Sequence, residues 1–408
     1  MPEFKKTIWI VNEYNGPGSP RIRQVVLAEL LLKNGYDVYI LAGSGNNSFK
    51  KWDKNIEFVE FDGAKFIVIK TFDYSGNTKR ALSSFCFQNK IWRNRKKLPK
   101  PDVIISDFAG FFGNVFLKWK KKYGTKVIYD ILDLWPEGFV DLGAIKKDSF
   151  IAKYLYKLEH KSYKNADGLI FSFEGGKDYI IDKKWDRQHG GDVDISDIGY
   201  INNGIDLDDF NKKAKICVLN DGDLKTKKFK AIYLGSISLF NGLEIIVEAA
   251  KKLQEANNQD VVFLIYGCGN KEEEIKALAK SYNLQNIVFK GKLDKDYAPY
   301  VLKQSDLNLF TFKNVGLLKY GVSPNKLFMY FSSEKPVLSM IKPAYDLVES
   351  RKCGISVNNE PQAVADAIVK FTKMDKKEYD TYCMNSKKVA EEYDYKNLVS
   401  ELIRFIEK

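Results

Sequence analysis

The sequence predicts an α/β fold made of two Rossmann-like parallel-sheet domains, and three observations support this. In the first half, short apolar runs of strand length alternate with amphipathic helical segments. The alternation stops in a stretch rich in Asp, Gly, Asn and Lys, residues 185–223, and then starts again. In each half a basic helix start follows a strand, which is where open α/β sheets bind ligands. Strands that alternate with helices form parallel sheets with right-handed crossovers.

The first half is expected to open with a strand over residues 7–12 and an amphipathic helix over 22–33, which Gly35 ends. A short helix is expected to end near residue 121. The further expected strands are 38–42, 56–61, 66–69, 102–106, 126–131 and 168–173, and the further helices are 79–98 and 149–164.

The second half repeats the alternation, with a linker near residues 203–210 before it. The predicted domains are therefore residues 1–205, 206–390 and 391–408, the last being a helix that packs back toward the first domain. The expected strands are 230–234, 261–266, 286–289, 307–312, 337–341 and 355–357, and the helices are 243–255, 271–279, one starting at Ser323, 361–373, 376–392 and 395–407. Only residues 198–205 of the stretch 185–223 are expected to be ordered.

Composition excludes several classes of protein. The five cysteines are an odd number, widely spaced and without a C-x-x-C pair, which argues for a reducing compartment and against a disulfide framework or a zinc module. No secretory signal is recognisable, and no window approaches the roughly 18 apolar residues of a membrane span. We expect a cytoplasmic protein. With two histidines in the chain, no metal cluster is expected.

The net charge of +12 calls for an anionic partner, and much of the excess lies in residues 90–100 and 118–122. Basic residues mixed with aromatic residues suit an anionic membrane surface, so we expect peripheral attachment to the inner face of the plasma membrane. Ordinary solvated helices are the alternative, and no nucleic-acid-binding signature is present. The predicted membrane or acceptor face is formed by Trp92, Arg93, Arg95, Lys96 and Trp119.

The stretch around Ser323 predicts an anion site. Ser323 reads as a helix N-cap and Pro324 as the first helical residue. Lys326 then lies in the first turn, where a cation opposes the helix dipole. An anion bound at the helix N-terminus removes this conflict, because free backbone N–H groups and the lysine would converge on it. The alternative is a solvated lysine on a surface helix.

The same arrangement occurs near the start of the chain. Gly16 and Gly18 form a loop after the first strand, and a Ser-Pro helix start follows, with Arg21 and Arg23 in its first turn. Two basic helix starts, one in each half, suggest one anionic ligand held by both, while two unrelated surface helices are the alternative. Neither half has Gly-x-Gly-x-x-Gly after its first strand or a Walker A loop, which disfavours nicotinamide enzymes and P-loop ATPases.

Several short motifs occur together in one order. They are Gly16–Gly18, Asp133-Leu-Trp-Pro-Glu137, Asn202-Asn-Gly-Ile-Asp206, Tyr233-Leu-Gly-Ser-Ile237, Asn241-Gly-Leu243, Ile265-Tyr-Gly-Cys-Gly-Asn270, Ser323-Pro-Asn-Lys326 and Lys335-Pro-Val337. With these motifs the chain resembles the retaining GT-B glycosyltransferases of family 4, in particular bacterial transferases that add N-acetylated aminosugars of the N-acetylfucosamine type to O-antigen or capsule. The resemblance implies two domains that face each other across a cleft, with C-terminal helices crossing back.

The resemblance also implies a function in surface polysaccharide biosynthesis. It implies a nucleotide-sugar donor, UDP-linked, bound mainly by the second domain, and a lipid-linked oligosaccharide or polysaccharide acceptor on the first. It further implies retention of configuration, with neither metal nor cofactor. The chain departs from the family at Gly321 and Met329, which occupy positions where members carry glutamates. Met329 cannot accept hydrogen bonds from ribose hydroxyls as a carboxylate does.

Site residues carry over onto matching positions. Lys326 is expected to stabilise the leaving diphosphate, and Asp133 and Glu137 to orient acceptor or sugar hydroxyls, with a loop-fixing role as the alternative for both carboxylates. The glycines have ordinary turns as their alternative. The predicted donor-binding residues are Gly16, Gly18, Arg21, Arg23, Gly235, Ser236, Gly267, Gly269, Ser323, Asn325 and Lys326.

Two other functions stay open at this stage. One is a UDP-sugar 2-epimerase on the same scaffold, which would turn over its donor without an acceptor. The other is a degenerate, non-catalytic nucleotide-binding partner of an active transferase, which Met329 makes conceivable. Such a partner would bind nucleotide without turnover.

Overall fold

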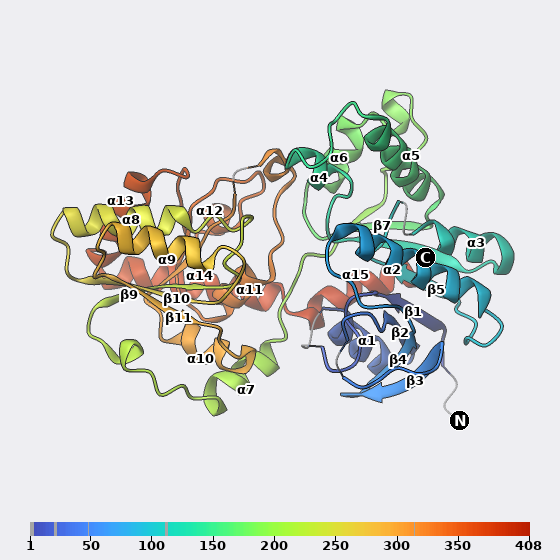
Figure 1. Ribbon diagram of the computed structural model, residues 1–408, viewed down its shortest axis with the longest axis horizontal. Coiled ribbons are helices and arrows are strands. Elements are labelled where there is room, and N and C mark those ends of the chain that lie inside the picture. The colour runs from blue at the N-terminus through green and yellow to red at the C-terminus, as the bar shows by residue number, and fades with distance from the viewer. Residues whose placement is uncertain (1–3, 20–22, 48, 111–112, 314) are drawn as a thin grey trace. The chain divides into compact units, whose positions relative to one another are not determined.

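The computed structural model describes residues 4–19, 23–47, 49–110, 113–313 and 315–408. The chain divides into two compact units, each built around its own sheet (Figure 1). Unit 1 contains the chain up to Asn202 together with Tyr395–Lys408, and unit 2 is Asn203–Asp394. Among the described residues, no helix is both long enough and apolar enough to span a membrane.

Unit 1 contains an eight-stranded sheet in the order β3-β4-β2-β1-β5-β6-β7-β8. Its strands are β1 (Thr7–Val11), β2 (Asp37–Gly43), β3 (Ile56–Phe61), β4 (Ala64–Ile69), β5 (Val103–Ser106), β6 (Lys126–Ile131), β7 (Gly168–Phe171) and β8 (Ile198–Tyr200). All neighbours are parallel except β3 and β4, so the expectation of parallel strands is wrong for this pair. Asp62 and Gly63 join them with φ of 50° and 75°, and two residues at positive φ form a tight hairpin turn.

Helices cover the sheet of unit 1 and complete its core. They are α1 (Arg23–Lys33), α2 (Asn77–Arg93), α3 (Asn114–Tyr123), α4 (Glu137–Asp141), α5 (Phe150–Asn165), α6 (Gly176–Asp182) and α15 (Tyr395–Glu407). The apolar stripe of α15 is buried in the same cluster as α1 and β1. Phe405 lies over Gly168 and Gly199, where a Cβ atom would come within 2.8 and 2.5 Å of its ring. The C-terminal helix is therefore an integral part of unit 1.

Unit 2 contains a six-stranded, fully parallel sheet in the order β11-β10-β9-β12-β13-β14. Its strands are β9 (Phe229–Leu234), β10 (Val261–Tyr266), β11 (Ile287–Gly291), β12 (Leu307–Phe310), β13 (Val337–Ser339) and β14 (Gly354–Ser356). Its helices are α7 (Leu207–Ile216), α8 (Glu244–Glu255), α9 (Glu272–Ser281), α10 (Ala298–Lys303), α11 (Asn325–Ser332), α12 (Leu347–Ser350), α13 (Pro361–Thr372) and α14 (Lys376–Glu392). Helices α8 and α13 lie side by side over one face and supply much of the core (Figure 1).

Two local predictions are wrong. The stretch 185–223 is not a continuous loop, because it contains α7, which the Asp206 side chain caps by accepting a hydrogen bond from the Asp209 backbone at 3.1 Å. Helix α11 begins at Asn325, with Pro324 rather than Ser323 at its N-cap position. Polar composition hides α7, since only Phe210 of its ten residues is buried. The sequence signal that could have predicted α7 is the capping residue Asp206 followed by Asp208 and Asp209 in the first turn.

Candidate functional site

Lys326 lies in the first turn of α11, and its ammonium group points into unit 2. The Nζ atom donates to the Oδ1 atom of Asn241, to the carbonyl of Thr311 at 3.3 Å and to the hydroxyl of Tyr233 at 3.4 Å. It also lies 5.0 Å from the centroid of the Tyr233 ring and 5.5 Å from that of Phe310. The strands β9 and β12 therefore hold this cation at their carboxyl ends through neutral groups.

The electrostatics of Lys326 are those of a cation that lacks an anion. Among the described residues, no carboxylate pairs with its ammonium group. Burial lowers the pKa of Lys326 to about 7, because desolvation disfavours the charged form. The dipole of α11 opposes the charge as well. A bound anion would compensate both effects, so the site is arranged to take one.

Asn241 fixes the position of Lys326 and was not among the predicted site residues. Its Nδ2 atom donates to the side chain and carbonyl of Ser236, at 2.9 and 3.0 Å, and to the Ser238 hydroxyl at 2.9 Å. These bonds orient the amide so that its oxygen faces Lys326. The Tyr233 hydroxyl also donates to the Ser236 carbonyl, at 2.8 Å. Ser236 therefore contributes to the site by holding Asn241 in place and not by contacting Lys326 itself. In the sequence, the Asn-Gly pair at 241–242, in the loop after a strand, could have indicated Asn241 as a site residue.

The glycines of unit 2 allow two loops to lie in contact. A Cβ atom at Gly267 would lie 1.8 Å from the Gly235 carbonyl, and one at Gly269 would lie 2.2 Å from the Ile237 carbonyl. The amide of Gly235 donates to the Tyr266 carbonyl at 3.0 Å, and the amide of Gly267 donates to the last residue of β11 at 2.8 Å. Gly235 and Gly267 were predicted to bind the donor, but their amides cannot donate to its phosphates in this arrangement, because protein carbonyls already accept their hydrogen bonds.

Ser323 joins α11 to the beginning of unit 2. Its hydroxyl accepts a hydrogen bond from the Asn203 amide at 2.9 Å, and its carbonyl accepts one from the Asn203 side chain at 2.6 Å. This contact explains why Ser323 does not cap the helix. Asn325 is exposed at the first helical position, directly beside Lys326.

The positions that depart from the family pattern remain without a carboxylate. Gly321 adopts a φ of 95°, and Met329 is partly buried in α11. The nearest downstream acid, Glu334, follows the C-terminal end of the helix and pairs with Lys303 at 2.9 Å. Glu334 therefore does not supply the carboxylate that is missing at Gly321 and Met329. It also lies at the opposite end of α11 from Lys326.

The glycine loop of unit 1 packs closely against the segment after β2. A Cβ atom at Gly16 would lie 2.6 Å from the Asn47 side chain, and Gly18, at φ 78°, would meet the Phe49 ring at 2.8 Å. These glycines are therefore required by packing within unit 1. Arg21 lies outside the described residues, so its predicted donor contact stays a prediction.

The hydrogen-bond partners of Arg23 among the described residues lie within unit 1. Its guanidinium group binds the Asp130 carboxylate with contacts of 2.9, 3.1 and 3.2 Å and donates to the Asn202 carbonyl at 2.7 Å. The side chains of Arg23 and Asp130 are only 3% and 7% exposed. The prediction that Arg23 binds donor phosphate is wrong, because a buried ion pair already uses the guanidinium group.

The two predicted carboxylates of the Asp133–Glu137 loop differ from each other. Glu137 accepts hydrogen bonds from the Tyr156 hydroxyl at 2.5 Å and from the Lys183 ammonium group, so it ties α4 to α5 and α6. The loop-fixing alternative holds for Glu137. Asp133 reaches solvent just after β6, although the surrounding protein desolvates its carboxyl and raises its pKa, an effect that Arg80 opposes.

Two further acids lie at the carboxyl ends of neighbouring strands and were not predicted. Burial raises the pKa of Glu13, which follows β1, to about 7. Burial and the charge of Asp130 raise the pKa of Asp107, which follows β5, well above its ordinary value. Asp107 accepts a hydrogen bond from Asn12 at 2.8 Å through one oxygen, while its other oxygen is buried and has no hydrogen-bond partner among the described residues. Together with Asp133 these groups form an acidic edge of the unit 1 sheet.

The predicted aromatic and basic face is only partly a surface. Trp119 is 1% exposed and lies edge-on to Trp9 with ring centroids 4.7 Å apart, so its prediction as a surface residue is wrong. Trp92 is partly buried against Trp119 and covered by Arg95, whose guanidinium lies 4.8 Å from its ring. The members of this face with exposed side chains are Arg93 and Lys96.

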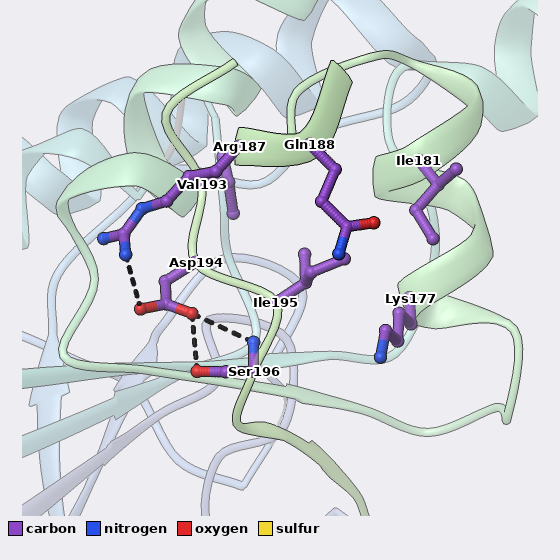
Figure 2. Close-up of a pocket in the computed structure, with 8 residues that line it drawn as sticks. All are labelled: Lys177, Ile181, Arg187, Gln188, Val193, Asp194, Ile195 and Ser196. Atoms are coloured by element: carbon purple, nitrogen blue, oxygen red, sulfur yellow. Dashed lines mark hydrogen bonds and ion pairs between the residues drawn. The ribbon is translucent and has the colours of Figure 1, made fainter. Parts of the chain in front are cut away.

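Unit 1 also contains a cavity of about 430 Å³ beside α6 (Figure 2). Arg187 and Asp194 line it and pair with each other at 3.2 Å, and Ser196 donates to Asp194 through both its amide and hydroxyl. The negative charge of Asp194, which lines the cavity, is therefore already balanced by Arg187 and by the hydrogen bonds from Ser196. Within the described ranges, no group of three or more His, Cys, Asp or Glu residues is arranged to hold a metal ion.

Comparisons with known proteins agree with this geometry. Family models described as Glycosyltransferase Family 4 and Glycosyl transferases group 1 match residues 25–209 and 228–373. The chain is 24% identical to the uncharacterized glycosyltransferase MJ1069 of Methanocaldococcus jannaschii over 332 residues, 79% of each chain. It is 31% identical to the putative colanic acid biosynthesis glycosyl transferase WcaI of Escherichia coli K12 over 238 residues, 57% of this chain and 56% of that one.

A solved structure shares the fold. The structure described as trehalose-6-phosphate from E. coli bound with UDP-2-fluoro glucose superposes with a TM-score of 0.73 at 12% sequence identity, over 98% of each chain. The prediction of two parallel-sheet α/β domains is confirmed.

Proposed function

Because the chain belongs to the GT-B glycosyltransferases of family 4, we propose that it transfers a sugar from a UDP-sugar to a hydroxyl group of a lipid-linked oligosaccharide or polysaccharide, with retention of configuration. The observation that carries this proposal is the buried ammonium group of Lys326, which has only neutral partners among the described residues. The UDP-2-fluoro glucose bound to the E. coli neighbour and the description of WcaI as a putative colanic acid biosynthesis glycosyl transferase support it.

The proposed role of Lys326 follows from where charge develops. When the bond between the anomeric carbon and the diphosphate breaks, negative charge grows on the leaving oxygens, and a desolvated cation stabilises it more strongly than a solvated one. The acceptor oxygen forms the new bond to the same carbon, and its proton passes to an oxygen of the leaving diphosphate, which departs as UDP. Asn325 and the amides at the start of α11, which no side chain caps, would bind the same phosphates.

The acceptor is proposed to bind at the acidic edge of unit 1. Asp133 is exposed at the carboxyl end of β6 and can accept a hydrogen bond from an acceptor hydroxyl. Asp107, at the end of β5, has a buried oxygen that no described residue contacts by a hydrogen bond. We propose an N-acetylated aminosugar as the donor sugar, in surface polysaccharide biosynthesis, and a reaction that needs neither a metal nor a cofactor.

Calorimetry with UDP on the wild type and on Lys326→Ala tests the site. We expect the variant to bind UDP at least tenfold more weakly. Equal binding by the two proteins would refute the phosphate site. A panel of UDP- and GDP-sugars with lipid diphosphate acceptors, analysed by mass spectrometry, then tests the reaction. Donor conversion without acceptor would indicate an epimerase, and binding without any product would indicate a degenerate module.

A further inference from the structure

The first turn of α5 exposes an unusual group of apolar side chains. Phe150 is 85% exposed, Ile151 61% and Tyr154 48%. Exposed lysines surround them on both sides in the chain. We call this group the Phe150 surface, and its members are Lys146, Lys147, Phe150, Ile151, Lys153, Tyr154 and Lys157.

The Phe150 surface is held in a defined position. The Ser149 hydroxyl caps α5 by accepting a hydrogen bond from the Ala152 amide at 3.1 Å, and the Ser149 amide donates to the Lys146 carbonyl at 3.0 Å. The turn before the helix and its first turn are therefore both fixed. The exposure of Phe150 and Ile151 is consequently a property of an ordered helix start.

The inward face of α5 is already fully used. Ala152, Glu159 and Tyr163 are buried, and Glu159 accepts hydrogen bonds from two tyrosine hydroxyls. At 3.6 residues per turn, Phe150 and Tyr154 lie on the opposite side of the helix from this buried stripe. They cannot reach the core of unit 1 by a rotation of the helix without exposing the stripe.

The charges of the Phe150 surface are uncompensated. Within the part of the chain that the structure describes, Lys146, Lys147, Lys153 and Lys157 form no ion pair. Asp148 is the acid inside the same segment. The surface therefore combines three large apolar side chains with an excess of positive charge.

We propose that the Phe150 surface docks onto an anionic membrane, with Phe150, Ile151 and Tyr154 entering the interfacial region and the lysines contacting lipid phosphates. Amphipathic helices that lie on membranes carry this combination of aromatic or aliphatic groups with flanking lysines. The cores of protein interfaces are instead depleted of lysine. Four lysines among three apolar groups therefore fit a lipid surface better than a protein partner.

The proposed membrane contact lies outside residues 90–100 and 118–122, the segments that the sequence suggested. The aromatic residues of residues 90–100 and 118–122 are used for packing within unit 1, so that segment presents charge with little apolar surface. The biological role of the Phe150 surface rests on the proposed function, because docking would hold the enzyme at the membrane, where a lipid-linked acceptor lies. The docking itself does not depend on that reaction.

Co-sedimentation of the full chain with vesicles tests the proposal. The vesicles consist of phosphatidylcholine with phosphatidylglycerol, and phosphatidylcholine alone is the neutral comparison. We expect Phe150→Ser/Ile151→Ser to reduce the partition coefficient on anionic vesicles at least tenfold. Lys146→Glu/Lys147→Glu should reduce it by a larger factor at low salt than at high salt, since these charges act through a screened interaction.

Two matched controls keep the test specific. Lys96→Glu/Lys97→Glu makes the same charge change in the predicted basic segment, and Leu82→Ser/Phe85→Ser removes two apolar groups that are each 55% exposed on α2. Both should leave binding within about twofold of the wild type. If either control variant loses binding while Phe150→Ser/Ile151→Ser retains it, the proposal is refuted.

Sedimentation velocity and UDP calorimetry separate the remaining outcomes. A wild-type dimer that the Phe150→Ser/Ile151→Ser change converts to a monomer, without vesicle binding by either protein, would identify a protein interface and overturn the membrane proposal. Wild-type protein that binds vesicles but not UDP would refute the proposed function and leave the docking surface standing. Melting temperatures within a few degrees of the wild type show that the variants are folded.

Discussion

The starts of α1 and α11 have similar sequences, but their basic residues have different partners. Each helix follows a Ser-Pro pair and has a basic residue in its first turn, Arg23 in one and Lys326 in the other. Arg23 is neutralised by Asp130, whereas the hydrogen-bond partners of Lys326 among the described residues are an amide, a carbonyl and a hydroxyl. A basic helix start therefore indicates a need for an anion, and whether the protein or a ligand supplies it depends on residues distant in the sequence.

This difference assigns opposite tasks to the two cations. Arg23 contributes to the fold, because its removal would leave a carboxylate buried without compensation. Lys326 contributes to binding, because the folded protein pays a desolvation cost for it that only a ligand offsets. The following predictions test this division, beginning with the largest effect.

Arg23→Ala should lower the free energy of unfolding by about 3–5 kcal/mol, since removing one partner of a buried ion pair leaves the other charge unpaired. Urea unfolding followed by circular dichroism measures this loss. Arg23→Met/Asp130→Leu removes both charges and should recover most of the stability. A single variant as stable as the wild type would contradict the structural role of Arg23.

Lys326→Ala should weaken UDP binding by about 1.5–3 kcal/mol, which is ten- to a hundredfold, because it removes a charge-assisted contact to phosphate. Without ligand, its melting temperature should be unchanged or slightly higher, since a first-turn cation opposes the helix dipole. Calorimetry and thermal unfolding measure the two effects. Lys326→Met, which keeps the apolar stem, is the matched control for packing. A large loss of stability without loss of UDP affinity would reverse the assignment.

UDP affinity should fall by about tenfold per pH unit above pH 7 in the wild type, because binding needs the protonated form of Lys326. Its pKa is lowered to about 7 in the free protein, and a bound diphosphate raises it, so the complex takes up a proton at pH 8 to 9. Calorimetry in two buffers of different ionisation enthalpy measures this uptake. A wild type that takes up no more protons than Lys326→Met at pH 8.5 would contradict the pKa assignment.

Much of the fold could be predicted because local patterns specify it. Helices α14 and α15 were predicted over residues 376–392 and 395–407, and the structure confirms both ranges. The β3–β4 hairpin was missed because the apolar runs identify strands but not their direction. The turn Asp62–Gly63 sets that direction.

Site residues could be predicted only where an unfavourable interaction is visible within a few neighbouring residues of the sequence. Lys326 stood out because a lysine in the first turn opposes the helix dipole, which is visible in four residues of sequence. The partner of Arg23 lies 107 residues away, so no local pattern distinguishes it from Lys326. Trp119 was assigned to a surface because lysines surround it in sequence, although the helical period turns it toward Trp9. Long-range contacts decide these cases.

The smallest expected effect on UDP binding comes from giving Lys326 a carboxylate partner like the one that Arg23 has. Asn241→Asp places a carboxylate beside the Lys326 ammonium group, as Asp130 stands beside Arg23. The new pair should raise the pKa of Lys326 and stabilise the free protein slightly, since an opposite charge favours the protonated form. The same carboxylate competes with a diphosphate for the cation and repels it.

We therefore expect Asn241→Asp to weaken UDP binding by roughly three- to tenfold, about 0.6–1.4 kcal/mol, and to remove most of the dependence of binding on pH between 7 and 9. Asn241→Ser is the control, because it shortens the side chain without adding charge. Calorimetry at pH 7 and pH 9 on the three proteins measures both effects. If Asn241→Asp binds UDP as tightly as the wild type with the same pH dependence, the missing counter-ion is not what makes the start of α11 a binding site.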